Sequence, residues 1–438
     1  MRTLGLLVLA LATSLAPRAQ QPSARRPYLD AALDIARWIE ASAIRTEHGV
    51  TWPADPNDPK SVSTTLYSGS PGVVLFLLEL HRATGDQTYL DRARLGADHL
   101  VAGIDDEKET GLYTGLAGIG YTLVEIANLT REAKYRDGAR KAADRLRALA
   151  RPAGKGVEWN DVTDIVGGSA GTGLFLLYAA KELEEPAYQD LATKAGHRLI
   201  ELARREGAGE KWAMSPAFPR LMPNFSHGTA GIAYFLATLS AETAEPVFLE
   251  HAIAGAGYLQ SIAKTEGEVC LIFHNEPDGR DLHYLSWCHG PPGTARLFYR
   301  LHQITKDAQW MEWVHKAARG VMASGIPEAR QPGYWNNVSQ CCGDAGVAMF
   351  FIDIARVSRR QDYLAFAQRT TEYLMSRGTR DDKGLRWVQA ENRTQPEKLV
   401  AQTGYMQGGA GMGMLLLRVD GMSRRRRLGV IFPDNPFE

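Results

Sequence analysis

The sequence predicts an all-α protein folded as an α/α toroid of seven inner and seven outer helices. A four-residue pattern, Gly-x-[Ala/Pro]-Gly, occurs seven times, and each copy, here called a glycine quartet, opens a short apolar run. In the first six copies, the residue twenty positions after the first glycine is aromatic. The quartets begin at Gly69, Gly115, Gly168, Gly228, Gly290, Gly343 and Gly408, and the aromatic residues are Tyr89, Tyr135, Tyr188, Phe248, Trp310 and Tyr363.

The constant offset indicates that one rigid unit is repeated. The distance from one quartet to the next varies from 46 to 65 residues, so all the length variation lies between the aromatic residue and the following quartet. Repeat architectures place such insertions in loops on one face, which is often the binding face.

The run after each quartet, such as residues 73–80, is apolar on nearly every side, which is typical of a helix packed all round. A strand of this length is the alternative, but Ala, Leu and the helical pattern that follows favour a helix. Segments that begin at the aromatic residues, such as residues 89–100, alternate apolar and charged faces at helical spacing and predict surface helices. Tyr28 begins such a segment before the first quartet, whereas Leu428 breaks the aromatic rule after the last.

The quartets have a structural and a functional consequence. Small residues let neighbouring inner helices cross closely, and glycine frees the turn into each helix. The quartets also mark seven helix N-termini, each with partly unpaired N–H groups and a positive dipole end. A closed toroid gathers these N-termini at one end, so the residues just before each quartet are expected to line that end.

The unbroken repeat predicts one domain over residues 24–438, although length alone suggests two or three. Formal net charge is zero, so nothing indicates nucleic acid as a partner, and we expect a monomer. Four consecutive arginines at residues 424–427 are interpreted as a solvated segment, with a basic interaction patch as the alternative.

Residues 1–23 predict a secretory signal peptide. Arg2 supplies a minimal basic region, residues 4–15 supply the apolar core, and a Gln/Pro/Ser stretch follows. The apolar run is shorter than the roughly 20 residues that a bilayer span needs. We therefore expect a secreted or periplasmic protein whose mature chain has no membrane span.

The cysteines predict a metal site. Cys288 lies two residues before the fifth quartet, Cys341 two before the sixth, and Cys342 one before the sixth. Equivalent positions in consecutive repeats must be neighbours, so three thiols are expected to converge, with zinc as their natural ion and a fourth place left for water or substrate. A disulfide or inert buried thiols are the alternatives, and Cys270 is a possible but disfavoured fourth ligand.

Two short motifs add a family resemblance. Trp287-Cys288-His289-Gly290 and Cys341-Cys342-Gly343, on a sevenfold toroid, resemble the lanthionine synthetase C-like family over nearly the whole predicted domain. Members of that family bind zinc through a Trp-Cys-x-Gly motif and a Cys-His-Gly motif. Cys342 therefore stands where the family usually has histidine, as in a Cys-Cys-Gly subset. The resemblance implies Zn²⁺ as the cofactor.

The family reaction, as the resemblance implies, adds a cysteine thiol to dehydroalanine or dehydrobutyrine and forms a thioether, here on a peptide or small-thiol substrate. Zinc keeps the incoming thiol deprotonated at neutral pH. Three protein thiolates donate more charge than two thiolates and an imidazole, so we expect a weakly held, reactive substrate thiolate. The enolate formed by the attack then needs a proton from an acid with a pKa near neutrality.

The resemblance also implies the acid–base residues. His227, directly before the fourth quartet, matches the family's catalytic histidine, and His289 occupies the same slot in the fifth repeat. Asp164 matches a family aspartate that acts on the substrate thiol or orients the histidine, with a helix N-cap as its alternative role.

One departure from the family concerns an arginine. Some peptide cyclases carry it four residues before the Trp-Cys-x-Gly cysteine, where this chain has Tyr284, and Arg280 or His283 are the candidates to replace it. Three tryptophans of the predicted rim loops are expected to pack rather than to grip a peptide, namely Trp212, Trp335 and Trp387.

Two other functions stay open. Glycoside hydrolysis, common on related α/α toroids, needs two opposed carboxylates, for which Asp164 and Asp344 are candidates, but that chemistry requires no rim cysteines. A non-catalytic zinc- or peptide-binding protein would keep the site without turnover. The expected export makes this alternative credible, because peptide cyclisation in the family is generally intracellular and this sequence has no fused dehydratase domain.

Overall fold

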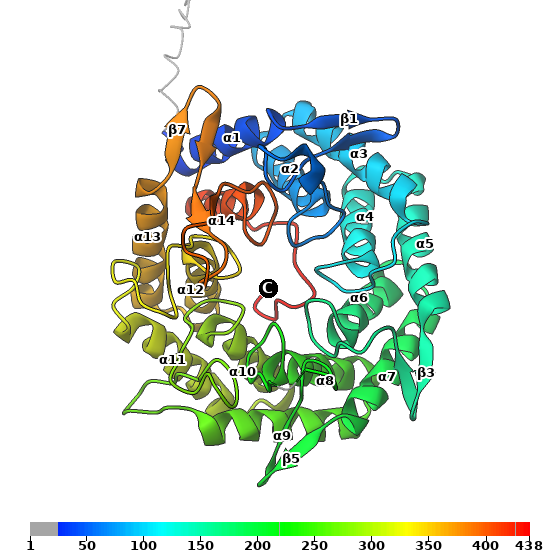
Figure 1. Ribbon diagram of the computed structural model, residues 1–438, viewed down its shortest axis with the longest axis vertical. Helices are drawn as coiled ribbons and strands as arrows, with labels where there is room; N and C mark the ends of the chain where they lie inside the picture. The colour runs from blue at the N-terminus through cyan, green and yellow to red at the C-terminus, as the bar shows by residue number, and fades with distance from the viewer. Residues whose placement is uncertain (1–24, 219, 425) are drawn as a thin grey trace, which may run out of the picture.

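The computed structural model describes residues 25–218, 220–424 and 426–438, which form a closed ring of paired helices (Figure 1). The inner helices are α2 (Ser70–Thr84), α4 (Leu116–Thr130), α6 (Ser169–Glu182), α8 (Thr229–Thr243), α10 (Pro291–Thr305), α12 (Asp344–Ser358) and α14 (Gly409–Ser423). The outer helices are α1 (Pro27–Glu40), α3 (Gln87–Gly103), α5 (Ala133–Leu149), α7 (Pro186–Glu201), α9 (Pro246–Ile262), α11 (Ala308–Ala323) and α13 (Gln361–Ser376). The predicted toroid of seven inner and seven outer helices is confirmed.

The predicted signal peptide, residues 1–23, lies outside the described residues. Within the part of the chain that is described, no helix is both long enough and apolar enough to cross a membrane. The arginine run at residues 424–427 follows directly on the end of α14.

The glycine quartets and the aromatic residues mark the helix starts. Each inner helix begins at the residue after the first glycine of its quartet, and that glycine is the N-cap. Each aromatic residue is the third residue of its outer helix. Several of these rings reach the preceding outer helix: Tyr135 donates to Arg94 O, Tyr188 to Asp144, and the Tyr363 hydroxyl bonds His315. The fixed offset therefore spans one inner helix, its turn and the first three residues of the next outer helix.

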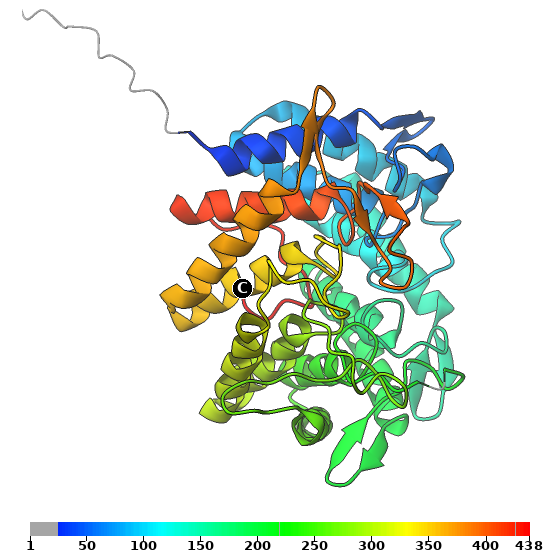
Figure 2. The ribbon, with the colours of Figure 1, turned by 60° about the vertical axis from the view of Figure 1, so that its left-hand side comes forward.

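The ring closes between the first and last helices. Among the described residues, no outer helix follows α14, and α1 packs against it instead, with Arg26 bonded to Asp420 at 3.0 Å. The exception at Leu428 now has a physical reason, because residues 428–438 run into the interior of the toroid (Figures 1 and 2).

The C-terminal segment is held inside the ring by buried polar contacts. One carboxylate oxygen of Glu79 accepts hydrogen bonds from the backbone N–H groups of Gly429 and Val430, both at 2.8 Å. Asp434 is fully buried, accepts from the Tyr113 hydroxyl at 3.1 Å and pairs with Arg296 at 3.1 Å. The segment thereby fills the space that seven inner helices leave at the centre of the ring.

Short hairpins and loops gather at the end of the toroid where the inner helices start (Figure 2). The strand pairs are β1 (Ile44–Thr46) with β2 (Gly49–Thr51), β3 (Arg151–Ala153) with β4 (Gly156–Glu158), β5 (Arg204–Glu206) with β6 (Gly209–Lys211), β7 (Thr379–Asp381) with β8 (Gly384–Arg386), and β9 (Gln389–Ala390) with β10 (Leu399–Val400), all antiparallel. Trp212 and Trp387 follow such hairpins and are buried, each donating its indole N–H at 2.7 Å to a carbonyl of the outer helix before it. These two tryptophans pack, as the sequence analysis expected.

A ring of backbone hydrogen bonds joins the turns that precede the inner helices. In every repeat except that of Val166, the residue two positions before the quartet donates its N–H to the carbonyl of the equivalent residue in the next repeat. Six such bonds, with N···O distances of 2.8–3.1 Å, run from Tyr67 to Tyr113, Tyr113 to Val166, Ser226 to Cys288, Cys288 to Cys341, Cys341 to Met406 and Met406 to Tyr67. The equivalent positions of the repeats therefore meet around one axis.

The last glycine of a quartet leaves room for this turn. A Cβ atom on Gly171 would lie 2.0 Å from the carbonyl oxygen of Ile165 and 3.1 Å from Cβ of Leu112 in the preceding repeat. Glycine is thus required at Gly171 because the helix start lies close to the turn of its own repeat and to the turn of the preceding repeat. The sequence suggested instead a close crossing of neighbouring inner helices.

We predict that Gly171→Ala lowers the free energy of unfolding by roughly 1–3 kcal/mol, because the added methyl group overlaps backbone that cannot move away cheaply. Gly257→Ala is the matched control, since a Cβ there meets nothing within 4 Å. Gly257 lies inside α9, so this change should raise stability by about 0.5–1 kcal/mol through helix propensity. Thermal unfolding of both variants checks the pair, and equal effects would contradict the assignment.

Candidate metal centre and active site

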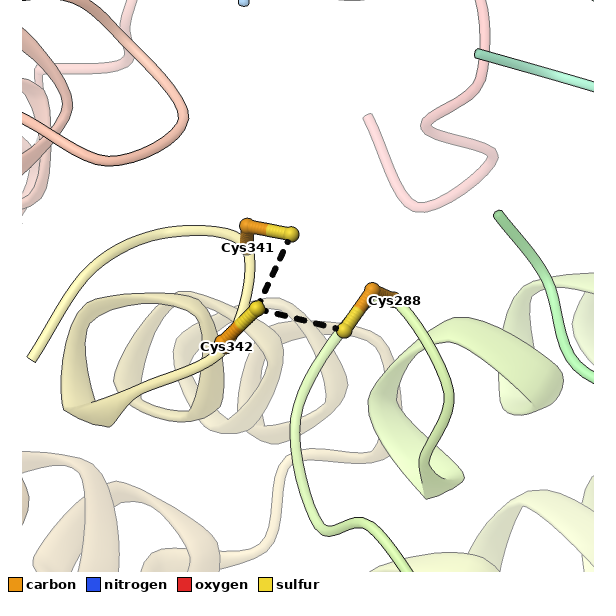
Figure 3. A group of neighbouring side chains, drawn as sticks. All are labelled: Cys288, Cys341 and Cys342. Carbon is orange, nitrogen blue, oxygen red and sulfur yellow. Dashed lines mark hydrogen bonds between the residues drawn. The ribbon is translucent and has the colours of Figure 1, made fainter. Parts of the chain in front are cut away.

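Three buried thiols converge where the fifth and sixth repeats meet (Figure 3). Cys288 precedes α10, and Cys341 and Cys342 precede α12. The Sγ atoms of Cys288 and Cys342 are 3.5 Å apart, those of Cys342 and Cys341 are 3.2 Å apart, and all three lie within 4.8 Å of one another. The structure thus brings the three predicted ligands together, while their metal binding stays a prediction.

The cluster fits a metal ion better than a disulfide. All four cysteines of the chain are free thiols, and a disulfide needs sulfur atoms about 2.05 Å apart. Sulfur ligands on one tetrahedral zinc ion lie about 3.8 Å apart, given a Zn–S distance of about 2.3 Å. Three buried thiols this close cannot all ionise without compensating positive charge, which a divalent cation supplies.

The backbone ring sets the position of the sulfur atoms. Cys288 donates its N–H to Cys341 O at 3.1 Å, and Cys341 donates to Met406 O at 2.9 Å. Two of the three thiols are therefore carried by residues of the ring itself. Cys342 is the next residue, and its N–H donates to the Ser339 hydroxyl at 3.2 Å.

Two further residues of the same repeat positions contact the thiols. The Tyr67 hydroxyl donates to Cys341 Sγ at 3.4 Å, and the Gln407 amide contacts both Cys342 Sγ at 3.6 Å and the Tyr67 hydroxyl at 2.8 Å. Neither residue was among the site residues predicted from the sequence. Their positions in the repeat could have predicted them, because Tyr67 lies two residues before the first quartet and Gln407 lies one residue before the seventh.

Cys270 is not part of the cluster. It is buried against α11, where its N–H donates to Lys316 O at 2.9 Å. Burial raises the pKa of its thiol to about 12. Cys270 is therefore an inert thiol packed against an outer helix, and it is excluded as a fourth ligand in this structure.

His227 and Asp164 form a hydrogen-bonded pair. His227 Nδ1 lies 2.7 Å from Asp164 Oδ2, and the histidine side chain is 31% exposed whereas the carboxylate is buried. Burial lowers the pKa of His227, but the hydrogen bond and charge of Asp164 outweigh burial, so the pKa is raised.

Asp164 both caps a helix and orients His227, the two alternative roles that the sequence left open. Its Oδ1 accepts the backbone N–H groups of Gly167 and Gly168 at 2.8 and 3.0 Å, which caps the turn into α6. Its Oδ2 is left for His227. One carboxylate therefore caps the third quartet and fixes the ring orientation of the histidine before the fourth.

His289 lies between two other aromatic side chains and beside His227. Its ring centroid is 5.6 Å from that of His227, 4.3 Å from that of His274 and 5.1 Å from that of Tyr284. Burial holds the pKa of His289 well below its usual range, and its Nδ1 has no hydrogen-bond partner among the described residues. A neutral imidazole results, which makes His289 a poorer acid than His227.

His274 was not predicted as a site residue, because it lies in the long loop before the fifth quartet. This loop has no equivalent position in the other repeats. Its ring packs 4.5 Å from Tyr284, and its Nδ1 bonds Asn275 Oδ1 at 2.6 Å. Nothing in the sequence placed this histidine at the rim.

The structure gives Tyr284 a different neighbour from the two that the sequence suggested. Arg393 Nε donates to the Tyr284 hydroxyl at 3.4 Å. Arg280 is largely exposed and pairs with Glu276 at 3.3 Å, and no contact joins His283 to the Tyr284 side chain in the described chain. Trp335 packs edge-on against Tyr284 at 5.3 Å, so this tryptophan borders the site.

Asp344 is committed to structure. It is fully buried at the start of α12, where it accepts from Arg330 at 2.8 Å and from the Tyr334 hydroxyl at 2.6 Å. Both of its oxygens are thus engaged, which argues against its use as the second carboxylate of a glycoside hydrolase.

The chain is thus a helical toroid with a candidate metal centre of three cysteines at one rim of the ring. The chain belongs to the lanthionine synthetase C-like family, because the model of that family, described as Lanthionine synthetase C-like protein, matches residues 60–430.

Solved structures share the fold at low sequence identity. Nisin cyclase is similar with a TM-score of 0.62 and 16% identity, covering 90% of this chain and 93% of that chain. The Lin0763 protein from Listeria innocua has a TM-score of 0.53 and 14% identity, over 91% of this chain and 99% of that one. An inactive variant of an alpha-1,6-mannanase of Salegentibacter sp., in complex with alpha-1,6-mannotriose, has a TM-score of 0.52 and 15% identity, over 89% and 98%. These likenesses show the fold alone.

We predict one zinc ion per chain in the purified protein, lost or strongly reduced in Cys288→Ala and Cys342→Ala, because each removes one of three ligands. Cys342→His should retain the ion, since imidazole is also a good zinc ligand. Elemental analysis after dialysis measures this, with Cys270→Ala as the matched control that keeps the ion. Equal metal content in all four variants would contradict the site.

Proposed function

We propose that the protein is a zinc-dependent enzyme that adds a thiol to the double bond of a dehydroamino acid, with a peptide or a small thiol as substrate. The observation that carries the proposal is the meeting of three free thiols with the His227–Asp164 pair at one rim of the ring. Membership of the lanthionine synthetase C-like family supports the same reaction class.

Cys288, Cys341 and Cys342 would hold the ion, which when bound supplies a Lewis acid that keeps the substrate thiol deprotonated. Around these residues, Tyr67 and Gln407 donate hydrogen bonds to sulfur and so fix the orientation of Cys341 and Cys342. Burial of the cluster excludes bulk water from the thiols.

His227 would supply the proton that completes the reaction. Asp164 accepts the Nδ1 hydrogen, which leaves Nε2 as the nitrogen that faces a substrate. In the addition, a sulfur–carbon bond forms at the β-carbon, the carbon–carbon π bond breaks, and an enolate results. The α-carbon then takes a proton from Nε2 of protonated His227, and the proton lost from the thiol balances the reaction without any redox change.

The glycoside hydrolase alternative rests only on the shared toroid, since an alpha-1,6-mannanase has a similar fold. The two carboxylates suggested by sequence are both engaged, Asp344 by Arg330 and Tyr334, and Asp164 by a turn and a histidine. A zinc- or peptide-binding protein without turnover would have the same geometry, and only an activity measurement separates it from an enzyme.

We predict that the protein accelerates thioether formation in a short peptide carrying dehydroalanine and cysteine, and in a dehydroalanine peptide supplied with glutathione. Cys288→Ala should abolish the acceleration, whereas Cys270→Ala, which alters a thiol outside the cluster, should keep it. Mass spectrometry after thiol alkylation follows loss of the free thiol. No acceleration by metal-loaded wild-type protein would favour the binding protein instead.

We predict that His227→Gln lowers kcat by roughly 10²–10⁴-fold, the usual contribution of a general acid.

Asp164→Asn should keep the turn, since an amide oxygen can still accept from Gly167 and Gly168, but should lower the pKa of His227 by removing the carboxylate charge. Activity requires the protonated form, so its decline with rising pH should begin at lower pH in this variant. A pH–rate profile unchanged from wild type would contradict the role of Asp164.

A further inference from the structure

Tyr284 and Arg393 come together at the rim although 109 residues separate them. Tyr284 lies in the turn before α10, four residues before Cys288. Arg393 lies in the loop between β9 and β10, and its Nε donates to the Tyr284 hydroxyl at 3.4 Å. The tyrosine is buried, and the arginine is half-buried. A loop of variable length therefore places a cation against a tyrosine that precedes the first cysteine of the cluster by four residues.

Arg393 has no carboxylate within ion-pair distance in the described part of the chain. Three other arginines in the segments that precede inner helices are paired, since Arg280 pairs with Glu276, Arg330 with Asp344 and Arg386 with Asp381. A partly buried guanidinium without an acidic partner loses hydration and gains no ion pair. Such a group is suited to a negative charge that arrives with, or develops on, a ligand.

The Tyr284 hydroxyl is oriented to donate. Because its oxygen accepts the Arg393 N–H, its own hydrogen is free for another acceptor. Edge-on packing against His289 at 5.1 Å and Trp335 at 5.3 Å fixes the ring. Burial raises the pKa of Tyr284 to about 12, so the hydroxyl keeps its proton at neutral pH.

We propose that Tyr284 and Arg393 form an oxyanion site that stabilises the enolate oxygen of the reacting dehydroamino acid. This inference rests on the proposed thiol addition. As sulfur bonds the β-carbon, the π electrons move through the α-carbon to the carbonyl oxygen, which becomes negative. Tyr284 donates a hydrogen bond to that oxygen and transfers no proton. Arg393 acts through the tyrosine hydroxyl and through its charge, as a positioning residue, until the α-carbon is protonated.

The test compares Tyr284→Phe, Arg393→Gln and Arg393→Lys with wild type, and uses Arg280→Gln as the matched control. Each protein is assayed for kcat and KM with the dehydroalanine peptide and glutathione, and its zinc content is measured. A second readout is calorimetric binding of a 2-nitroethyl thioether as its nitronate anion, which copies the sulfur, two carbons and planar oxyanion of the enolate.

Tyr284→Phe should lower kcat by roughly 10²–10³-fold, as loss of one oxyanion donor does elsewhere, with little change in KM or zinc content. Its Kd for the nitronate should rise by a similar factor. Arg393→Gln should lower kcat by about tenfold or more, and Arg393→Lys should recover part of the loss because the charge returns. Arg280→Gln should behave as wild type, since its side chain is largely exposed and paired elsewhere.

Two results would overturn the inference and are told apart by the wild-type assay. If wild type adds the thiol but Tyr284→Phe and Arg393→Gln keep its kcat and its nitronate affinity, the oxyanion site is wrong and the proposed function stands. If zinc-loaded wild type adds no thiol to any acceptor, the proposed function fails and the oxyanion site fails with it. Folding does not confuse the test, because Tyr284→Phe keeps the buried aromatic ring and Arg393 lies on a half-buried loop outside the core.

Discussion

The ring of backbone hydrogen bonds two residues before each quartet is the constraint on which the rest of the structure depends. Each bond contributes only about 1 kcal/mol net, but together they fix the register between successive repeats. Because the bonds join equivalent residues, side chains at these positions meet around one axis. A cluster of three thiols there then requires only cysteines at the right register of two consecutive repeats, and the Cys288–Cys341 backbone bond keeps these two repeats together.

At this rim, one residue, Asp164, both stabilises the fold and orients a candidate catalytic side chain. Asp164 gives one oxygen to the turn before α6 and the other to His227, so the group that orients the histidine is held by the fold itself. Below the rim, Asp434 of the C-terminal segment contacts Tyr113, a member of the backbone ring, whose aromatic ring packs 5.4 Å from Trp287, the residue before Cys288. The interior segment therefore supports the candidate site from behind.

Register explains what the sequence could and could not predict. Cys288, Cys341, Cys342, His227 and His289 all lie one or two residues before a quartet, so the repeat alone placed them at one rim. Tyr67 and Gln407 obey the same rule and could have been predicted with them. His274 and Arg393 lie in loops of variable length, where no repeat position relates sequence to space. For the same reason, the sequence suggested Arg280 and His283 as partners for this position, whereas the structure places Arg393 beside Tyr284.

The charge of the candidate centre connects its metal ligands with its acid. A thiolate at Cys342, where the family usually has a neutral imidazole, adds one negative charge to the cluster. Negative charge at Cys341 already raises the pKa of His227, alongside the larger contribution of Asp164. In the proposed reaction, a more anionic cluster would favour release of a substrate thiolate and would also keep His227 protonated for the second step. The same charge would oppose formation of an enolate close by, and the Arg393 guanidinium, which has no ion pair among the described residues, would offset that repulsion at the proposed oxyanion site. Cys342 would therefore add the negative charge that favours the first step, and Arg393 would supply the positive charge that compensates for it in the second.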